Sequence, residues 1–195
     1  MNTKGMDNAR YVQTEESIRE AFWELIRQKP WQSISIREIV ERARINRVTF
    51  YYHYKDLYDL VDRVETELMQ TVFRPLHHIT REDYVIGQHP LTTAFFRAFR
   101  ENQKKFYLLL GSNGDAGFHS RMIDELVSVF EDHWKKVFVQ DGMEEKISDA
   151  YFAYLAGGLV SMMIRNGTRL SSDELGVVAG KMIVSMNEIA LGQEK

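Results

Sequence analysis

Two helix-start signals that lie close together constrain the fold of this chain more than any other feature. Ser35 and Glu38 have the spacing of a capping box, in which each side chain accepts a hydrogen bond from the other residue's backbone N–H. Asn46 is a preferred capping residue for a further helix that begins at Arg47. The pattern predicts two short helices joined by a three-residue turn, which is a helix-turn-helix.

Helical periodicity extends along the rest of the chain. Only three prolines occur in 195 residues, which favours an all-α fold. We expect polar, frayed residues up to position 10, a helix from Thr14 to Lys29, and a helix capped by Asp56 that runs to Pro75. Further helices are predicted from Pro90 to position 110 and over 118–139, 144–166 and 172–191. The expected domains are a helix-turn-helix domain, 1–75, and a larger helical C-terminal domain, 76–195.

Composition excludes several classes of protein. The chain has no cysteine, so disulfides and thiolate sites are excluded. The N-terminus has no apolar signal segment, and no window approaches a membrane span, so we expect a soluble cytoplasmic protein. The histidines do not have zincin spacing and no serine lies in a nucleophile elbow. We therefore expect no enzyme activity, no metal site and no cofactor.

The segment NRVTFYYHYKD, residues 46–56, carries the chemistry of the predicted second helix of this motif. The net charge of the chain is −3, yet from Arg42 to Lys55 it holds cations and no acidic residue, which gives a local positive face. Helical phase places Phe50 and Tyr54 toward a core formed with Ile36, Ile39, Val40 and Leu60. The side chains expected to point outward are Arg47, Val48, Thr49, Tyr51, Tyr52 and His53.

Each outward residue suits a duplex. Arg47 can fork onto a guanine edge, Val48 can pack on a thymine methyl group, and Thr49 can reach a phosphate or a base. Tyr51, Tyr52 and His53 suit phosphate oxygens along the groove. The alternative is a solvated helix face with incidental aromatic residues.

The last two predicted helices are apolar on more than one face and contain the pair Gly157-Gly158, which allows another backbone to approach. We interpret them as a homodimer interface made by Gly157, Gly158, Met162, Leu175, Val178, Met182, Ile183 and Met186. The alternative is a large monomeric core, which periodicity does not distinguish. A ligand pocket is also predicted, unless its rings simply fill the core. Its expected residues are Phe95, Phe99, Phe106, Phe130, His133, Trp134, Tyr151, Tyr154 and Met162.

Residues 14 to 61 resemble the DNA-binding domain of the TetR/AcrR family of transcriptional regulators. The resemblance rests on SIREIVERARINRVTFYYHYKDLYDL, in which the family pattern is matched at Ile36, Ile39, Ala43, Ile45, Asn46, Thr49, Phe50, Tyr51, His53, Tyr54, Asp56 and Leu60. It implies DNA contacts at Arg37, Arg47, Val48, Thr49, Tyr51, Tyr52 and His53. It also implies an Ω-shaped homodimer joined by the last two helices, and commonly a ligand pocket in each C-terminal domain.

Two residues depart from the family pattern. Arg44 stands where the family has glycine, at a position expected to be left-handed. Leu57 stands where the family commonly has a lysine that meets a phosphate, so Lys55 and the aromatic side chains are the expected anchors.

The sequence therefore predicts a DNA-binding transcriptional regulator. Its expected partners are double-stranded DNA, a second copy of the chain and a small-molecule effector, and it is expected to repress from a palindromic operator. The alternative is a TetR-like dimer that acts as a protein-interaction adaptor without strong operator binding, which Arg44 and Leu57 would favour.

Overall fold

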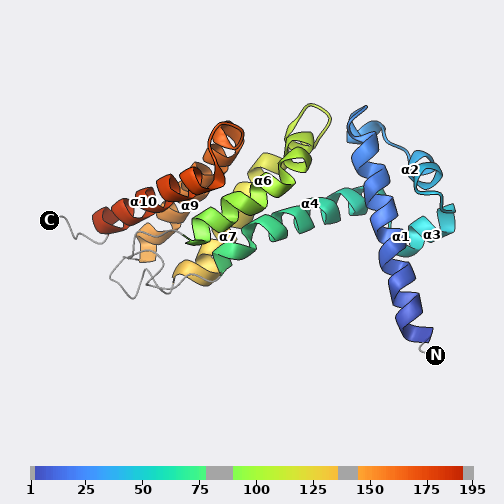
Figure 1. Ribbon diagram of the computed structural model, residues 1–195, viewed down its shortest axis with the longest axis horizontal. Coiled ribbons are helices and arrows are strands. Elements are labelled where there is room, and N and C mark those ends of the chain that lie inside the picture. The colour runs from blue at the N-terminus through green and yellow to red at the C-terminus, as the bar shows by residue number, and fades with distance from the viewer. Residues whose placement is uncertain (1–2, 78–89, 136–144, 191–195) are drawn as a thin grey trace. The chain divides into compact units, whose positions relative to one another are not determined.

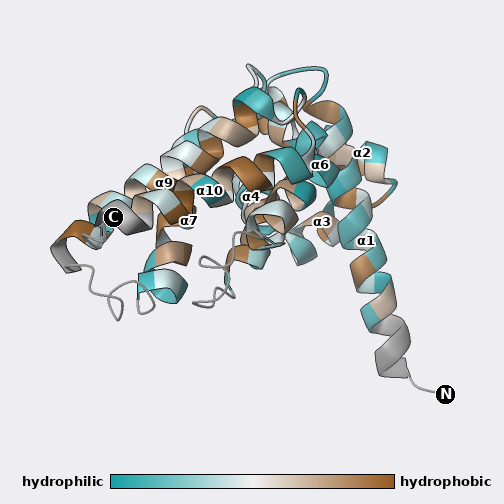
Figure 2. Cartoon of the chain, turned by 60° about the vertical axis from the view of Figure 1, so that its left-hand side comes forward, coloured by the Kyte–Doolittle hydropathy of each residue, from teal (hydrophilic) through white to brown (hydrophobic). Residues whose placement is uncertain are grey.

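The computed structural model describes residues 3–77, 90–135 and 145–190. All of its regular elements in these ranges are helical (Figure 1). They are α1 (Thr3–Leu25), η1 (Trp31–Ser33), α2 (Ile36–Ala43), α3 (Arg47–His53), α4 (Leu57–Phe73), η2 (Arg74–His77), α6 (Pro90–Leu110), α7 (Phe118–Val129), η3 (Phe130–Trp134, a π-helical turn), α9 (Glu145–Asn166) and α10 (Ser172–Ala190). The all-α prediction is confirmed, and apolar residues alternate with polar ones around the helices (Figure 2). The expected helix ends at Val139 and Leu191 lie outside the described residues.

The start of the first helix differs from the prediction. Thr14 does not cap the helix; its Oγ1 donates to the backbone carbonyl of Arg10 at 2.8 Å, one turn earlier in a helix that begins at Thr3. A threonine inside a helix can satisfy its hydroxyl in this way. The polar residues before Thr14 are therefore helical rather than frayed.

The chain forms two compact units. The first unit comprises Met1–Glu67 and Lys104–Phe118, and the second comprises Leu68–Gln103 and His119–Lys195. Helices α4 and α6 each run from one unit into the other. The domain division at residue 75 stays a prediction.

The first unit has a core made by α1, α2, α3 and α4. Ile18, Phe22, Ile39, Phe50 and Leu60 are fully buried in it. Burial of such side chains contributes about 1.5–3 kcal/mol each relative to exposure.

The segment 104–118 belongs to the first unit through direct bonds. The carbonyl of Asn113 accepts from the backbone N–H of Trp31 at 2.9 Å, and its Nδ2 donates to the carbonyl of Ile26 at 3.1 Å. Lys105 lies over the ring of Trp23, with Nζ 5.5 Å from the centroid. The loop thus satisfies backbone groups where the chain leaves α1.

The second unit has an aromatic core. Phe95, Phe96 and Phe99 of α6 are buried, as are Phe130 and Trp134 of η3. The indole Nε1 of Trp134 donates to the carbonyl of Leu76 at 2.6 Å, so this buried polar group is paired.

Helices α6 and α10 approach closely at one glycine. A Cβ at Gly176 would lie 2.1 Å from Oγ1 of Thr93, and Oγ1 of Thr92 donates to the Gly176 carbonyl at 2.9 Å. A larger residue at Gly176 would force these helices apart.

One described helix, Ile147–Asn166 within α9, is long and apolar enough to cross a membrane by length and composition, contrary to expectation. Forty-four per cent of its most apolar window is buried inside the chain, and the core helix of a soluble protein passes the same test.

Candidate nucleic-acid interface

The start of α2 is fixed by a capping box, as predicted. Oγ of Ser35 accepts from the backbone N–H of Glu38 at 3.3 Å, and Oε2 of Glu38 accepts from the N–H of Ser35 at 2.9 Å. Nζ of Lys29 donates to both Glu38 oxygens at 2.7 and 2.8 Å. These hydrogen bonds, with that of Lys29 the largest contribution, lower the pKa of Glu38 to about 2.

The turn between α2 and α3 is left-handed at Arg44, as the missing glycine suggested. Arg44 has φ 55° and ψ 42°, and it is the only described non-glycine residue with positive φ. This conformation costs a non-glycine residue about 1–2 kcal/mol. Asn46 then caps α3, because its Oδ1 accepts from the backbone N–H of Thr49 at 2.7 Å.

The two faces of α3 are divided largely as helical phase predicted. Phe50 is fully buried and Tyr54, just after the helix, is 1% exposed. On the opposite side Val48 is 79% exposed, Tyr52 77% and Tyr51 46%. Arg47 is also exposed, and its Nη2 donates to the hydroxyl of Tyr51 at 3.1 Å. The helix therefore presents an aromatic and cationic surface to solvent.

The predicted outward orientation of His53 is wrong. Its side chain is 5% exposed and stacks on Tyr11 of α1 at a centroid distance of 4.1 Å. This burial lowers the pKa of His53, and its Nδ1 has no hydrogen-bond partner among the described residues. The phase of α3 could not reveal the burial, because the covering residue, Tyr11, precedes the expected helix start at Thr14.

The remaining predicted contact residues lie at the edges of this surface. Arg37 is exposed, and its Nε pairs with Glu41 at 2.7 Å, so it must exchange that partner to reach a phosphate. Thr49 and Leu57 are half-buried, and Lys55 is exposed. The backbone N–H of Lys55 donates to Asp59 Oδ2 at 2.9 Å, which leaves its ammonium group available.

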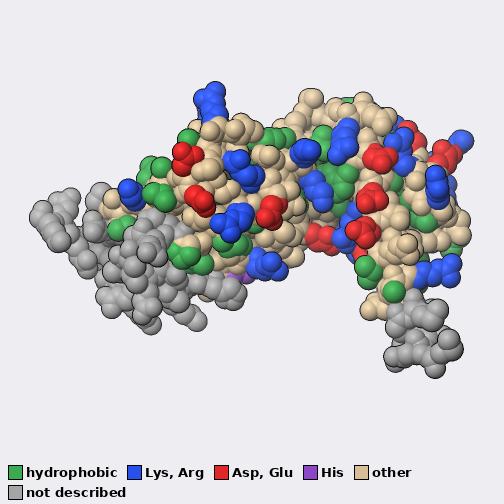
Figure 3. All heavy atoms as spheres, viewed as in Figure 1, with side chains coloured by type: hydrophobic (Ala, Val, Ile, Leu, Met, Phe, Trp, Pro, Cys, Tyr) green, Lys and Arg blue, Asp and Glu red, His purple; other side chains and the backbone are tan. Residues whose placement is uncertain are grey.

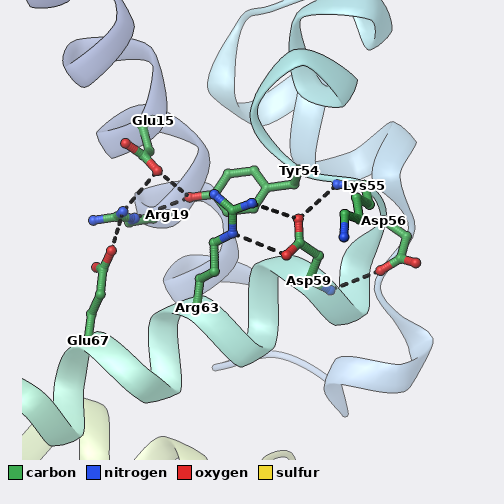
Figure 4. Close-up of polar contacts among 8 residues, drawn as sticks. All are labelled: Glu15, Arg19, Tyr54, Lys55, Asp56, Asp59, Arg63 and Glu67. Atoms are coloured by element: carbon green, nitrogen blue, oxygen red, sulfur yellow. Dashed lines mark hydrogen bonds and ion pairs between the residues drawn. The ribbon is translucent and has the colours of Figure 1, made fainter.

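A polar network around Tyr54 holds the end of α3 against α1 and α4 (Figure 4). The Tyr54 hydroxyl accepts from Nε of Arg19 at 3.2 Å and donates to Glu15 Oε1 at 3.4 Å. Arg19 also pairs with Glu67 at 2.6 Å. The guanidinium of Arg63 lies 5.2 Å from the Tyr54 ring centroid. Side chains of two helices, α1 and α4, thus converge on the buried tyrosine that ends α3, which fixes the orientation of α3.

The residues predicted for a dimer interface, except Gly157, line an apolar groove between α9 and α10. The groove has a volume of about 260 Å³, and its lining includes Tyr154, Gly158, Met162, Leu175, Val178, Met182, Ile183 and Met186. Several of its hydrophobic side chains are exposed: Tyr154 at 59%, Met182 at 49% and Val178 at 43%. Figure 3 shows hydrophobic side chains at the surface of this part of the chain. A Cβ at Gly157 or Gly158 would meet no atom within 4 Å in the described part of the chain.

The residues predicted for a ligand pocket are divided. Phe95, Phe99, Phe130, Trp134 and Tyr151 are buried in the second unit. Phe106 belongs to the first unit, where its ring packs near that of Phe118, with 5.9 Å between the ring centroids. His133 and Tyr154 are exposed, and Met162 is half-buried. The pocket stays a prediction.

The fold and this surface define a helix-turn-helix protein with an all-α C-terminal region. Residues 18–64 match the family of bacterial regulatory proteins described as the tetR family. The match covers the N-terminal helices, so this part of the chain is similar to the regulatory proteins of that family. No curated protein matches the chain in sequence.

Solved structures share the fold over nearly the whole chain. The dihydroxyacetone kinase operon activator DhaS has 17% identity and a TM-score of 0.65, with 91% of this chain and 97% of that chain covered. A TetR transcriptional regulator from Streptococcus agalactiae has 17% identity and a TM-score of 0.61, with 93% and 99% covered. A transcriptional regulator of Aquifex aeolicus has 18% identity and a TM-score of 0.61, with 89% and 99% covered. At this identity the likeness shows the fold alone.

Proposed function

We propose that this chain is a sequence-specific transcriptional repressor that binds a palindromic operator as a homodimer and responds to a small-molecule effector. The observation that carries the proposal is the exposed face of α3. This one short helix exposes Val48, Tyr51 and Tyr52 together, and no acidic residue lies between Arg42 and Lys55.

The chemistry of this face suits the major groove. Val48 near the start of α3 can contact a thymine methyl group, and Arg47 can exchange its hydrogen bond to Tyr51 for the O6 and N7 atoms of guanine. Tyr51 and Tyr52 lie further along α3 than Arg47 and Val48. Their hydroxyls suit phosphate oxygens on the groove wall. Such contacts place base readout at the N-terminal end of α3.

The groove between α9 and α10 supports a homodimer. Two adjacent glycines inside a helix destabilise it by about 1 kcal/mol each relative to alanine, and no atom of the described chain uses the space that they leave. The exposed Val178 and Met182 flank the same groove. A second copy packed on this face would bury them. A dimer bound to a palindromic operator would set its two α3 helices in successive major grooves, about 34 Å apart.

The response to a ligand would use the helices that run through both units. Helices α4 and α6 each contribute to the first and to the second unit, so a ligand that shifts either helix can reorient α3. A difference in ligand affinity of about 1–3 kcal/mol between the two arrangements would release the operator appreciably. Similar structures include both an operon activator and the alkane-degradation repressor AlkX. The fold is thus shared by activators and repressors. Repression, and a cytoplasmic location, are therefore proposed here separately from DNA binding.

Selection of binding sites from random duplexes, followed by fluorescence anisotropy, tests the DNA-binding proposal. The protein should recover a palindrome and bind it about 10³-fold more tightly than a random duplex, with affinity that falls steeply with salt. Sedimentation should give a dimer, and a reporter driven by the recovered site should be repressed. Equal and weak binding to both duplexes would refute sequence-specific regulation.

The second candidate function is that of a dimeric adaptor that contacts another protein. The half-buried Leu57 favours it, because the first turn of α4 then lacks a cation for phosphate. An adaptor would remain dimeric in sedimentation but would yield no site in the selection, so the same two measurements separate the candidates.

A further inference from the structure

Arg10 and Arg44 differ from most arginines of the first unit. Arg37 pairs with Glu41, Arg42 with Glu24 and Arg63 with Asp59. Within the described residues, the side chains of Arg10 and Arg44 have no hydrogen bond and no ion pair. Both are exposed, so their charges are available to a ligand.

These two arginines line one groove. It lies between α1 and the α2–α3 turn, has a volume of about 600 Å³, and is lined by polar and aromatic side chains that include Thr14, Asn46, Tyr52 and His53. Among the residues whose side chains the structure describes, no acidic one lines it. The groove therefore brings together two arginine side chains that have no partner among the described residues, which fits an anion.

Arg44 retains a conformation that glycine would adopt without strain. Strained backbone persists where the surroundings enforce it, and it is enriched at binding sites. Glycine at position 44 would relieve the strain, but it would also remove one of the two cations from the groove. The left-handed turn and the groove are independent observations that involve the same residue.

We propose that this groove binds a backbone phosphate of the DNA duplex, with the guanidinium groups of Arg44 and Arg10 as its donors. The site rests on the proposed DNA-binding function and adds a contact outside α3. Arginine suits it because its planar fork forms paired, charge-assisted hydrogen bonds with phosphate oxygens. Arg44 thereby supplies a charge that the first turn of α4 lacks at Leu57.

The decisive variant is Arg44→Gly in the full-length protein, because its two effects have opposite signs. Relief of the left-handed strain should raise the melting temperature. Loss of the cation should weaken binding to the selected operator and to a random duplex alike, by about three- to tenfold at 0.1 M salt. The slope of log affinity against log salt should become less steep by about 1. If the variant is more stable than wild type and binds DNA less tightly, unfolding cannot explain its loss of affinity.

Two further variants and a phosphate scan locate the contact. Arg10→Gln should reproduce the loss of affinity, whereas Arg27→Gln, which removes an exposed arginine outside the groove, should leave affinity and slope unchanged. Duplexes with single methylphosphonate substitutions should reveal one position at which wild type loses affinity and Arg44→Gly does not.

Each result decides the matter. Unchanged affinity and salt slope for Arg44→Gly, while wild type prefers its operator, would overturn the phosphate site and leave the DNA-binding function intact. Failure of wild type to prefer any duplex would overturn the proposed function, and the phosphate site with it.

Discussion

Replacing Tyr54 by phenylalanine tests whether the polar network fixes α3. The variant keeps the buried ring and its contact with Arg63, and it removes only the hydroxyl between Arg19 and Glu15. Hydrogen bonds to charged groups contribute about 1.5–3 kcal/mol. The two bonds here are long, at 3.2 and 3.4 Å, and Arg19 retains Glu15 at 3.0 Å after the change. We therefore expect a loss of about 1–1.5 kcal/mol.

That loss should lower the melting temperature by about 2–6 °C, since a chain of this size loses about 2–4 °C per kcal/mol. Thermal and urea unfolding followed by circular dichroism measure it. The matched control is Tyr52→Phe, which removes the same hydroxyl from a side chain that is 77% exposed and should change stability by less than about 0.5 kcal/mol.

The pH dependence provides a second check. Burial raises the pKa of Tyr54 to about 12 from an ordinary value of about 10. A raised pKa means that the neutral phenol stabilises the fold fully below pH 10 and that this contribution is lost as the pH rises toward 12. The deficit of Tyr54→Phe should therefore shrink above pH 10. Equal stability of wild type and variant at pH 7, or a deficit that grows with pH, would refute the assigned role of the hydroxyl.

Three further predictions concern separate parts of the chain. Arg47→Ala should weaken operator binding by about 1–3 kcal/mol, and random-duplex binding by less, as measured by anisotropy. Met182→Glu should give monomers in sedimentation, whereas Lys181→Glu, outside the groove lining, should remain dimeric; monomers of both would argue against a specific α9–α10 interface. Glu38→Gln should lower the melting temperature at pH 7, because the lowered pKa of Glu38 beside Lys29 stabilises the fold above pH of about 4.3. This deficit should vanish as the pH falls toward 2, and a deficit that persists there would exclude an ionic cause.

The local features of the helix-turn-helix could be predicted because their causes lie within a few residues. Ser35 and Glu38 cap α2, Asn46 caps α3 and Asp56 accepts from the N–H of Asp59, each over three residues of sequence. The left-handed turn at Arg44 followed from the glycine that the family has there. Short-range hydrogen bonds of this kind are readable from sequence.

The missed features depend on contacts between distant residues. His53 is covered by Tyr11, so its burial depends on the helical start of α1 rather than on the phase of α3. Phe106, which was predicted together with aromatic residues of the second unit, belongs to the first unit, where its ring lies 5.9 Å from that of Phe118 between centroids. Periodicity identifies which side of a helix is apolar, whereas the partner of that side is decided by the tertiary fold.

The bonds made by Asn113 bear on whether the N-terminal helices could be transferred to another protein. A fragment that ends after α4 would keep every helix of the helix-turn-helix, yet it would lose the residue that satisfies the N–H of Trp31 and the carbonyl of Ile26. The N-terminal helices alone are therefore not a complete folding unit that could be moved to another protein. A chimaera that exchanges the first unit must exchange residues 104–118 together with the N-terminal helices. A fusion with a single junction cannot exchange both segments.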